Sequence, residues 1–482
     1  MHYRELIIRS ATTLLGVIAG CAVGPNFSRP DAPPDKHYVN GGDPTATTRA
    51  DGTAQTFDQN VKLPADWWQL FNSPKVDAVV HEALINNPGL QAAQASLRQS
   101  QDLLRSGYGI FYPQADADAE ATRQKFSPLK FGQNSQPGIF NLFTLSASVS
   151  YALDVFGGER RAVEALAAQV DLQRNTERAA YLTLSANIAN AMIAQAAYRA
   201  EIEATERLIE LQERQVQLAK VQAQAGTAPY STVLTLQSQL DSYRATIPQL
   251  RQQLSQTDDL LASLVGHTPA EWKAPRIDFA EIGLPSNLPV SLPSDLTRQR
   301  PDILEAEATL HAASANIGVA TANMLPNVTL SADYGVNNTS LSHLFAGNAT
   351  FWGLGADVTT PIFEGGTLWY KRKAAIDNYQ QTAALYRQTV LSAFAQVADT
   401  LRALQHDAEI LEAQDEALAA ARQALHLVQA NFQAGLANYS DVLIADVQFH
   451  QAKIADLQTI AMRYQDTVAL FVALGGGWWN AK

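Results

Sequence analysis

Cysteine is almost absent from this 482-residue chain, which has only one, at position 21. A single cysteine cannot form a disulfide within the chain, so packing alone must stabilise the fold. Charge is also sparse: Asp, Glu, Lys and Arg make up 17% of the residues, and the net charge is −12. Because this acidic balance offers little to neutralise a phosphate backbone, we expect no nucleic acid partner.

Long apolar runs are missing as well. No stretch of about 18 apolar residues follows Cys21, so the sequence predicts no membrane-spanning helix beyond it. Before it, Arg4 and Arg9 precede an apolar stretch over residues 11–19, which is the pattern of a secretory signal peptide over residues 1–20. The stretch ends Ile-Ala-Gly-Cys, which resembles the lipobox of bacterial lipoproteins, and Ala22 is not the Asp that signals inner-membrane retention there. We expect Cys21 to be lipidated, although a lone cysteine could also be a buried small side chain.

Signatures of catalysis are absent too. The sequence contains no His-Glu-x-x-His, no Gly-x-Ser-x-Gly and no Gly-x-x-x-x-Gly-Lys. Its nine His residues show no metal-ligand spacing. Asp258 and Asp259 form an acidic pair, but adjacent residues of a helix point apart. We therefore expect a protein that is not an enzyme, with no catalytic residue, cofactor or metal.

Two long segments lack proline and almost lack glycine. They cover residues 158 to about 225 and residues 366 to about 434. At 1.5 Å per residue, each would form a helix of roughly 100 Å. Each runs into a short turn with glycine and then into a second helical segment, over about residues 231–264 and 440–474, so we expect two helical hairpins. Ser231 and Ser440 are the expected N-caps of the second helices.

The hairpins belong to an internal duplication. Phe-Gly-Gly at 156–158 is echoed by Phe-Glu-Gly-Gly at 363–366, and Gln-Ala-Gly at 224–226 is echoed at 433–435. A proline-rich stretch between the copies excludes long regular elements there. We expect a lipid-anchored extended segment over residues 21–62, a first repeat over 63–266, a proline-rich connection over 267–299 and a second repeat over 300–482. Each repeat should contain a helix, two strands and a long hairpin.

Four segments alternate apolar and polar residues, as half-exposed strands do. They cover residues 142–155, 327–337, 351–363 and 114–122. Their length and alternation match a tilted transmembrane barrel with apolar side chains outward, although a soluble sheet alternates in the same way. Four strands cannot close a barrel, so two, three or four copies of the chain would have to share one.

Acidic residues dominate the polar side of these strands, with Arg123 as the main basic exception. The candidates for an acidic lumen are Asp116, Asp118, Glu120, Asp154, Asp333 and Asp357. Repeated around a symmetric pore, they would make it electronegative and favour cations. They could also be ordinary solvated charges at the edge of a bilayer.

Several motifs in this order resemble the outer-membrane factor family of tripartite efflux systems of the RND type, in particular its lipoprotein branch. They are Cys-Ala-Val-Gly-Pro-Asn-Phe at 21–27, Trp-Trp at 67–68, Tyr-Ala-Leu-Asp-Val-Phe-Gly at 151–157, Arg-Pro-Asp-Ile at 300–303, Pro-Ile-Phe-Glu-Gly-Gly at 361–366 and Ala-Leu-Gly-Gly-Gly-Trp at 473–478. The resemblance spans residues 21 to 479. It implies an α+β membrane protein: a homotrimer whose single twelve-stranded outer-membrane β-barrel, four strands per chain, continues into a long periplasmic α-helical barrel.

The resemblance also implies partners and a gate. A channel of this kind docks to a periplasmic adaptor and, through it, to an inner-membrane RND-type pump. The hairpin tips would meet the adaptor, here through Gly226, Thr227, Tyr230, Gly435, Leu436 and Tyr439. Asp441 matches the position of a gating carboxylate in some relatives, but it could equally stabilise the start of its helix.

Two other functions share some of these features. The outer-membrane duct of a protein-secretion system has the same architecture, and only the lipobox favours efflux over it. A periplasmic scaffold lipoprotein would need the helices but neither the alternating strands nor ion conductance. The paired tryptophans at 67–68 and 478–479 lie outside the strands, so we expect them to be packed rather than to anchor the chain at a membrane surface.

Overall fold

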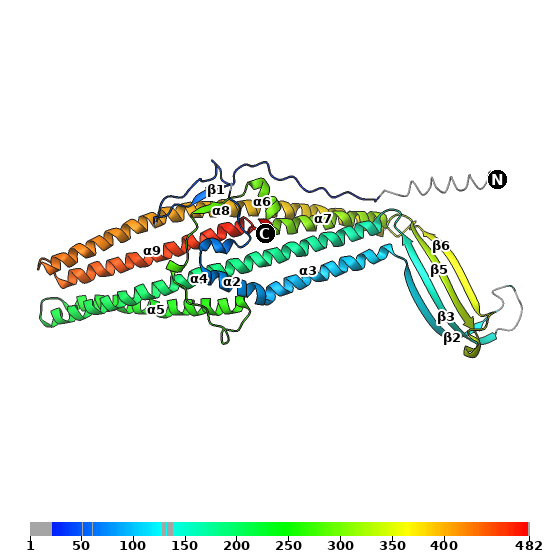
Figure 1. Ribbon diagram of the computed structural model, residues 1–482, viewed down its shortest axis with the longest axis horizontal. Helices are drawn as coiled ribbons and strands as arrows, with labels where there is room; N and C mark the ends of the chain where they lie inside the picture. The colour runs from blue at the N-terminus through cyan, green and yellow to red at the C-terminus, as the bar shows by residue number, and fades with distance from the viewer. Residues whose placement is uncertain (1–21, 51, 60, 128–131, 133–137, 481–482) are drawn as a thin grey trace. The chain divides into compact units, whose positions relative to one another are not determined.

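The computed structural model describes residues 22–50, 52–59, 61–127, 132 and 138–480, which form two compact units (Figure 1). Unit 1 contains the described residues of 22–29, 96–173 and 306–386. Unit 2 contains residues 30–95, 174–305 and those from 387 onward. Each unit therefore combines segments from both halves of the chain.

A four-stranded antiparallel sheet dominates unit 1 (Figure 1). Its strands are β2 (Gln114–Phe126), β3 (Gly138–Leu153), β5 (Asn327–Asn338) and β6 (Thr350–Thr359), in the spatial order β2-β3-β5-β6. All four alternating segments of the sequence are thus strands. Their pairing is continuous in register, so residues opposite one another on neighbouring strands share a face of the sheet.

Two helices of 67 residues each occupy the segments without proline: α4 (Gly158–Gln224) and α8 (Thr367–Gln433). They are followed by α5 (Tyr230–Val265) and α9 (Tyr439–Ala473), which complete the two predicted hairpins (Figure 1). Pro248 lies inside α5 without ending it. None of the described helices is long and apolar enough to span a membrane.

The hairpins meet in the core of unit 2. Leu208 and Leu211 of α4 pack with Leu443 and Val447 of α9, and Tyr243 of α5 covers the cluster. Leucine and valine at helical spacing on two helices produce this contact, because each helix must bury its apolar stripe against another element. The cluster holds the two hairpins together, although their sequences are more than 200 residues apart.

Shorter elements make up the rest of the two units. Before the strands come η1 (Trp67–Phe71), α2 (Pro74–Asn86), α3 (Pro88–Gly107) and η2 (Tyr108–Phe111). Where the sequence predicted one helix, the structure has two, because Pro88 disfavours helical backbone at Asn87. The proline-rich connection forms only η4 (Phe279–Glu281), β4 (Asn287–Pro289) and α6 (Pro293–Gln299), and α7 (Pro301–Ala322) follows it. β4 pairs in parallel with β1 (Thr56–Asp58).

Candidate functional site

The sheet of unit 1 separates its charges by sign. Asp116 on β2 is paired with Ser148 on β3, which is paired with Asp333 on β5, so both acids lie on one face, called here the polar face. This face carries all the acids of the four strands: Asp116, Asp118, Glu120, Asp333 and Asp357. Five of the six predicted lumen residues are therefore brought together on one surface.

Arg123 lies on the opposite face, and its predicted place among the acids is wrong. The strand stays in register to its end, so the alternation from Asp116 puts residue 123 on the other side. Arg123 is paired with Asn141 and donates from Nη1 to Oδ1 of Asn141 at 3.5 Å. Lys125, paired with Ile139, shares this face. The bases of the four strands therefore lie on one face and the acids on the other.

Asp154 is also not on the polar face, because β3 ends at Leu153. Its carboxylate accepts hydrogen bonds from the backbone N–H groups of Glu159 and Arg160 at 3.0 and 3.1 Å. It also pairs with the Arg160 side chain at 2.9 Å. Asp154 therefore caps the beginning of α4. Ile362, expected on a strand, lies beyond the end of β6 at Thr359.

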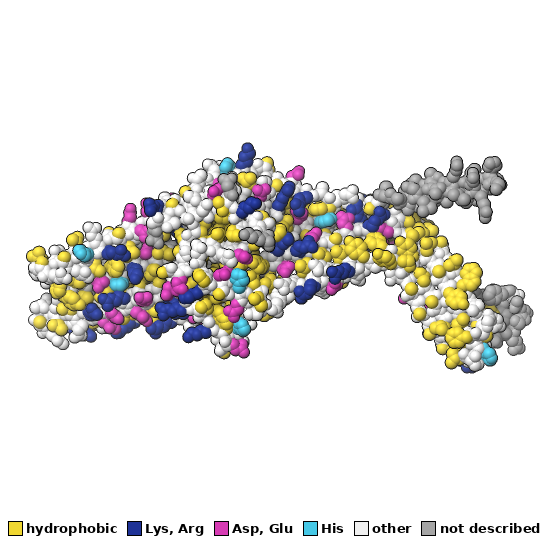
Figure 2. Space-filling view, viewed as in Figure 1, with side chains coloured by type: hydrophobic (Ala, Val, Ile, Leu, Met, Phe, Trp, Pro, Cys, Tyr) yellow, Lys and Arg dark blue, Asp and Glu magenta, His cyan; other side chains and the backbone are white. Residues whose placement is uncertain are grey.

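The face opposite the acids is apolar and exposed. Trp352, Leu354 and Val358 on β6 are 73%, 79% and 66% exposed, and Tyr334 on β5 is 60% exposed. Figure 2 shows hydrophobic side chains gathered over the strands. An apolar surface of this kind marks contact with an apolar phase or with another protein. The two outer strands, β2 and β6, each pair on one side only within the described chain, which leaves ladder groups open for another strand.

The hairpin tips are two tight turns with glycine in the left-handed region. Gly226 has φ +71° and Gly435 has φ +74°, a conformation that side chains with a Cβ disfavour. The N–H of Thr227 donates to the carbonyl of Gln222, and the N–H of Leu436 donates to that of Asn431, which closes the last helical turn in both places. The tips also present apolar side chains: Tyr230 (66% exposed), Leu436 (79%) and Tyr439 (39%).

Asp441 takes part in the cap of α9. It is the third residue of the helix, and its Oδ2 accepts the backbone N–H of the N-cap Asn438 at 3.0 Å, as in a capping box. The expected serine caps are wrong. Both helices begin one residue before those serines, and the N-caps are Pro229 and Asn438, both with extended backbone. The side chain of Asp441 is nevertheless exposed.

An N-terminal strap, residues 22–29, lies along unit 1. Cys21 itself lies outside the described residues. The N–H of Val23 donates to the carbonyl of Phe156 at 2.9 Å. The buried Arg161 donates to the carbonyl of Val23 and, at 2.6 Å, to Oδ1 of Asn26, and it also pairs with Glu164. No local pattern in the sequence indicates this network, because Val23 and Asn26 lie more than 130 residues from Arg161.

A second buried arginine joins the N-terminal segment of unit 2 to α9. Arg463 is 1% exposed and donates to Gln55 Oε1 at 2.9 Å and to the carbonyls of Ala50 and Thr53 at 3.2 and 3.1 Å.

An acidic pair lies close to Arg463. Burial and a hydrogen bond with Asp466 raise the pKa of Asp407 to about 7. Sequence reasoning missed this cluster as well, since nothing in the sequence near position 463 indicates partners 408 residues away.

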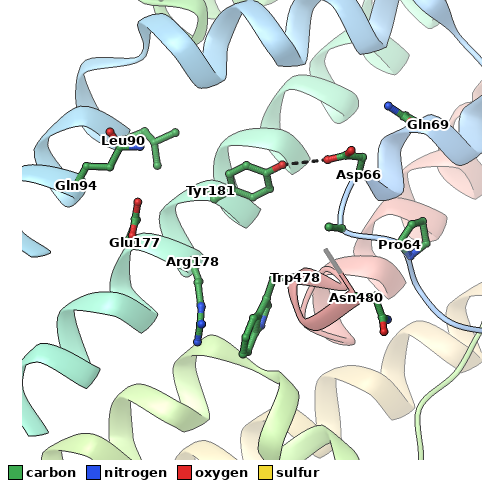
Figure 3. A pocket seen from close by; sticks show the side chains of 11 residues that line it. Pro64, Asp66, Gln69, Leu90, Gln94, Glu177, Arg178, Tyr181, Trp478 and Asn480 are labelled. Carbon is green, nitrogen blue, oxygen red and sulfur yellow. Dashed lines mark hydrogen bonds between the residues drawn. The ribbon is translucent and has the colours of Figure 1, made fainter. Parts of the chain in front are cut away.

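The tryptophans are packed, as expected. Trp67 and Trp68 are fully buried in unit 2. Trp478, in η6 (Trp478–Asn480), stacks against Arg178, whose Cζ lies 3.5 Å from the ring centroid. Both residues line a cavity of about 690 Å³, shown in Figure 3, where the Tyr181 hydroxyl donates to Asp66 at 3.3 Å. These contacts join segments far apart in the sequence and give Trp478 a packing role.

Comparison with known proteins identifies the class of molecule. The sequence matches the outer membrane efflux protein family over residues 79–267 and 292–476, which is more than half of the chain. The chain belongs to the outer membrane efflux protein family. It is 28% identical over 476 residues to the toluene efflux pump outer membrane protein TtgC of Pseudomonas putida, with coverage of 96% of this chain and 94% of TtgC.

Two further comparisons agree with this assignment. The probable outer membrane lipoprotein SilC of Salmonella typhimurium is 27% identical over 475 residues, which cover 98% of this chain and 99% of SilC. Among solved structures, the outer-membrane channel OprN matches with a TM-score of 0.83 and 25% identity, over 95% of this chain and 100% of OprN. This efflux-family chain is therefore an outer-membrane protein with the general role of a duct in efflux, in a family of channel proteins rather than enzymes.

Proposed function

We propose that this chain is the outer-membrane channel subunit of a tripartite efflux system, a passive exit duct for small compounds. The observation that carries the proposal is the sheet of unit 1, with its acids on one face, an exposed apolar band on the other and two edges without a partner strand in the described chain. Such a sheet is stable in a membrane only when its edges are closed by further strands. Its polar face would then line the pore.

Three copies would supply twelve strands. The edge strands β2 and β6 are antiparallel within the chain, so β6 of one copy can continue the ladder onto β2 of the next in the same up-and-down order. Closure is favourable because it removes both exposed edges. Eight or sixteen strands would satisfy the same argument, and the resemblance to trimeric efflux channels favours twelve.

The apolar band has the thickness of a membrane. On β3 it runs from Phe143 to Leu153, which is about 33 Å along the strand. With a tilt near 45°, this corresponds to about 23 Å across the bilayer, close to the band of roughly 25 Å seen in outer-membrane barrels. Beyond β6, Trp369 and Tyr370 are 57% and 67% exposed, as aromatic residues at a membrane surface are.

A lipid on Cys21 would help to hold the sheet of unit 1 in the membrane. The strap holds Val23 at the carbonyl of Phe156, between the end of β3 and the beginning of α4. A lipid attached two residues earlier would enter the bilayer beside the end of the sheet. Arg161, which fastens the strap, is then a positioning residue for the anchor.

The hairpin tips are the proposed docking site for a periplasmic adaptor, which would link the channel to an inner-membrane RND-type pump. Exposed Tyr230, Leu436 and Tyr439 offer apolar contacts there, on turns fixed by Gly226 and Gly435. Three copies would also bring three Asp441 carboxylates into one ring at the second tip. Their repulsion and hydration would form a gate in addition to the cap described above. The first tip has no equivalent acid.

The duplicated sequence fits this assembly. Repeats over residues 63–266 and 300–482 would each contribute two strands to the barrel and one hairpin to the helical tunnel. The segments over 21–62 and 267–299 would form a belt outside the tunnel.

Purified mature protein in planar bilayers tests the proposal. We expect discrete, long-lived conductance steps and a mass three times that of the 52.3 kDa chain, less the signal peptide. Folded, inserted oligomers that never conduct would contradict the duct and favour a scaffold lipoprotein. Conducting oligomers of another stoichiometry would keep the duct and reject the trimer.

A further inference from the structure

The apolar face of the sheet ends in a pair of cations. Ala121 and Phe143 form the last apolar pair of the band between β2 and β3. The next pairs on that face are Arg123 with Asn141 and Lys125 with Ile139. Both cations are exposed, and they stand two residues apart on one strand, about 7 Å along it. We call Arg123, Lys125, Asn141 and Ile139 the basic patch.

The basic patch lacks a counter-charge among the described residues. Every acid of the four strands lies on the opposite face. Within the described part of the chain, Lys125 has no ion pair and Arg123 has only its 3.5 Å contact with the Asn141 amide. If the two cations only marked the end of the apolar band, they would not need to be neighbours on the sheet. Here both stand side by side next to Asn141, whose Oδ1 accepts from Arg123 and whose Nδ2 group can donate, an arrangement that fits a single phosphate group.

We propose that the basic patch binds the phosphate of an anionic membrane lipid. This inference rests on the proposed function, in which the apolar face contacts the bilayer. The acyl chains of the lipid would lie against the apolar band. Its headgroup phosphate would contact Arg123 and Lys125, the next residues on that face beyond Ala121. Ile139, 63% exposed beside Lys125, would contact the glycerol region. A free phosphate ion would use the cations but not the neighbouring apolar surface, so the patch fits a lipid better.

The basic patch lies at the edge of the sheet, where neighbouring copies would meet in the proposed barrel. It lies on β2, an edge strand, at the end where β2 and β3 are connected to each other. In the proposed barrel, β2 pairs with the neighbouring copy. A lipid held there would occupy the outer surface of the seam between copies, so three equivalent lipids would bind per trimer.

The test uses the full mature protein in nanodiscs of phosphatidylcholine with a minor fraction of phosphatidylglycerol. Native mass spectrometry then gives the ratio of the two lipids retained. We expect wild type to enrich phosphatidylglycerol and the Arg123→Gln/Lys125→Gln variant to lose this enrichment by about fivefold for each cation removed. The matched control is Arg214→Gln/Lys220→Gln, which removes two exposed charges from α4 and should retain it.

Conductance in pure phosphatidylcholine separates this inference from the proposed function. A double variant that conducts like wild type but no longer enriches phosphatidylglycerol supports lipid binding at the patch. Equal enrichment in wild type, variant and control would overturn it, while conducting channels would leave the duct intact. Absence of channels in wild type would reject the duct itself, whatever the lipid ratio.

Discussion

The carboxylate of Asp441 accepts a hydrogen bond from the backbone N–H of Asn438, the N-cap residue of α9, at 3.0 Å. Asp441 thus makes a capping contact and is also the residue that we propose as the gating charge. The two roles can be separated, because Asn438 belongs to the cap but brings no charge.

We expect Asn438→Ala and Asp441→Ala each to lower stability by about 1 kcal/mol through loss of the cap. Of these two variants, only Asp441→Ala should also raise single-channel conductance, since it removes the proposed ring of carboxylates. Asp441→Asn should raise conductance as well. If all three variants conduct like wild type, Asp441 is a cap and not a gate.

Arg463 should be among the most costly residues to replace. Arg463→Leu would leave Gln55 and two carbonyl groups buried without their donor, and each buried acceptor left unsatisfied costs about 1–3 kcal/mol. Thermal unfolding in detergent should show a clearly lower midpoint, and amide exchange around residues 47–55 should accelerate. Arg214→Leu, at an exposed position, is the control and should change the midpoint little. A comparable effect of both substitutions would contradict this role.

Stability should depend on pH through Asp407. Its pKa is raised to about 7 in the folded protein by burial and by Asp466, whereas an unfolded Asp titrates near about 3.9. Folding therefore takes up a proton between these values, and the stabilisation is present at low pH and lost as pH rises through about 7, by at most about 1.4 kcal/mol per pH unit.

Asp407→Asn should flatten that pH dependence, because the amide cannot ionise. The midpoint of thermal unfolding, followed from pH 5 to 8, provides the measurement. A variant whose midpoint falls with pH as steeply as that of wild type would show that another group is responsible.

The strap depends on a close approach between two backbones. A Cβ at Gly318 would stand 2.6 Å from Cγ of Arg161 and 2.9 Å from the carbonyl oxygen of Val23. We expect Gly318→Ala to loosen the strap, seen as faster amide exchange over residues 22–29. Gly347→Ala, where a Cβ would meet nothing within 4 Å, is the control. Unchanged exchange in the Gly318 variant would mean that the strap tolerates the methyl group.

Local patterns predicted most of the architecture. The absence of proline from the segments of α4 and α8 was enough to predict two very long helices, and strict alternation predicted all four strands. Alternation also predicted the face of Asp116 and Asp333, because the strands contain no extra residue that would shift the register. Arg123 was assigned to the wrong face because residues were grouped by polarity. Odd and even positions of a strand lie on opposite faces, so the position of a residue decides its face.

Predictions failed where the chain leaves regular structure or where partners are distant in the sequence. Asp154 follows the last residue of β3 and therefore caps a helix instead of facing a pore. The N-caps of the helices after the tips lie two residues before the predicted serines, at Pro229 and Asn438, which have extended backbone. Arg161 and Arg463 bind segments more than 130 residues away, and a single sequence contains no signal for such contacts.

The most direct test of the central claim is the reversal potential of single channels in a salt gradient. If the acids of the polar face line the pore, wild type should prefer cations, and Asp116→Asn/Asp333→Asn should weaken that preference. Arg123→Gln, on the opposite face, should leave it unchanged. A preference for chloride in wild type, or equal shifts from substitutions on both faces, would contradict a pore lined by the polar face.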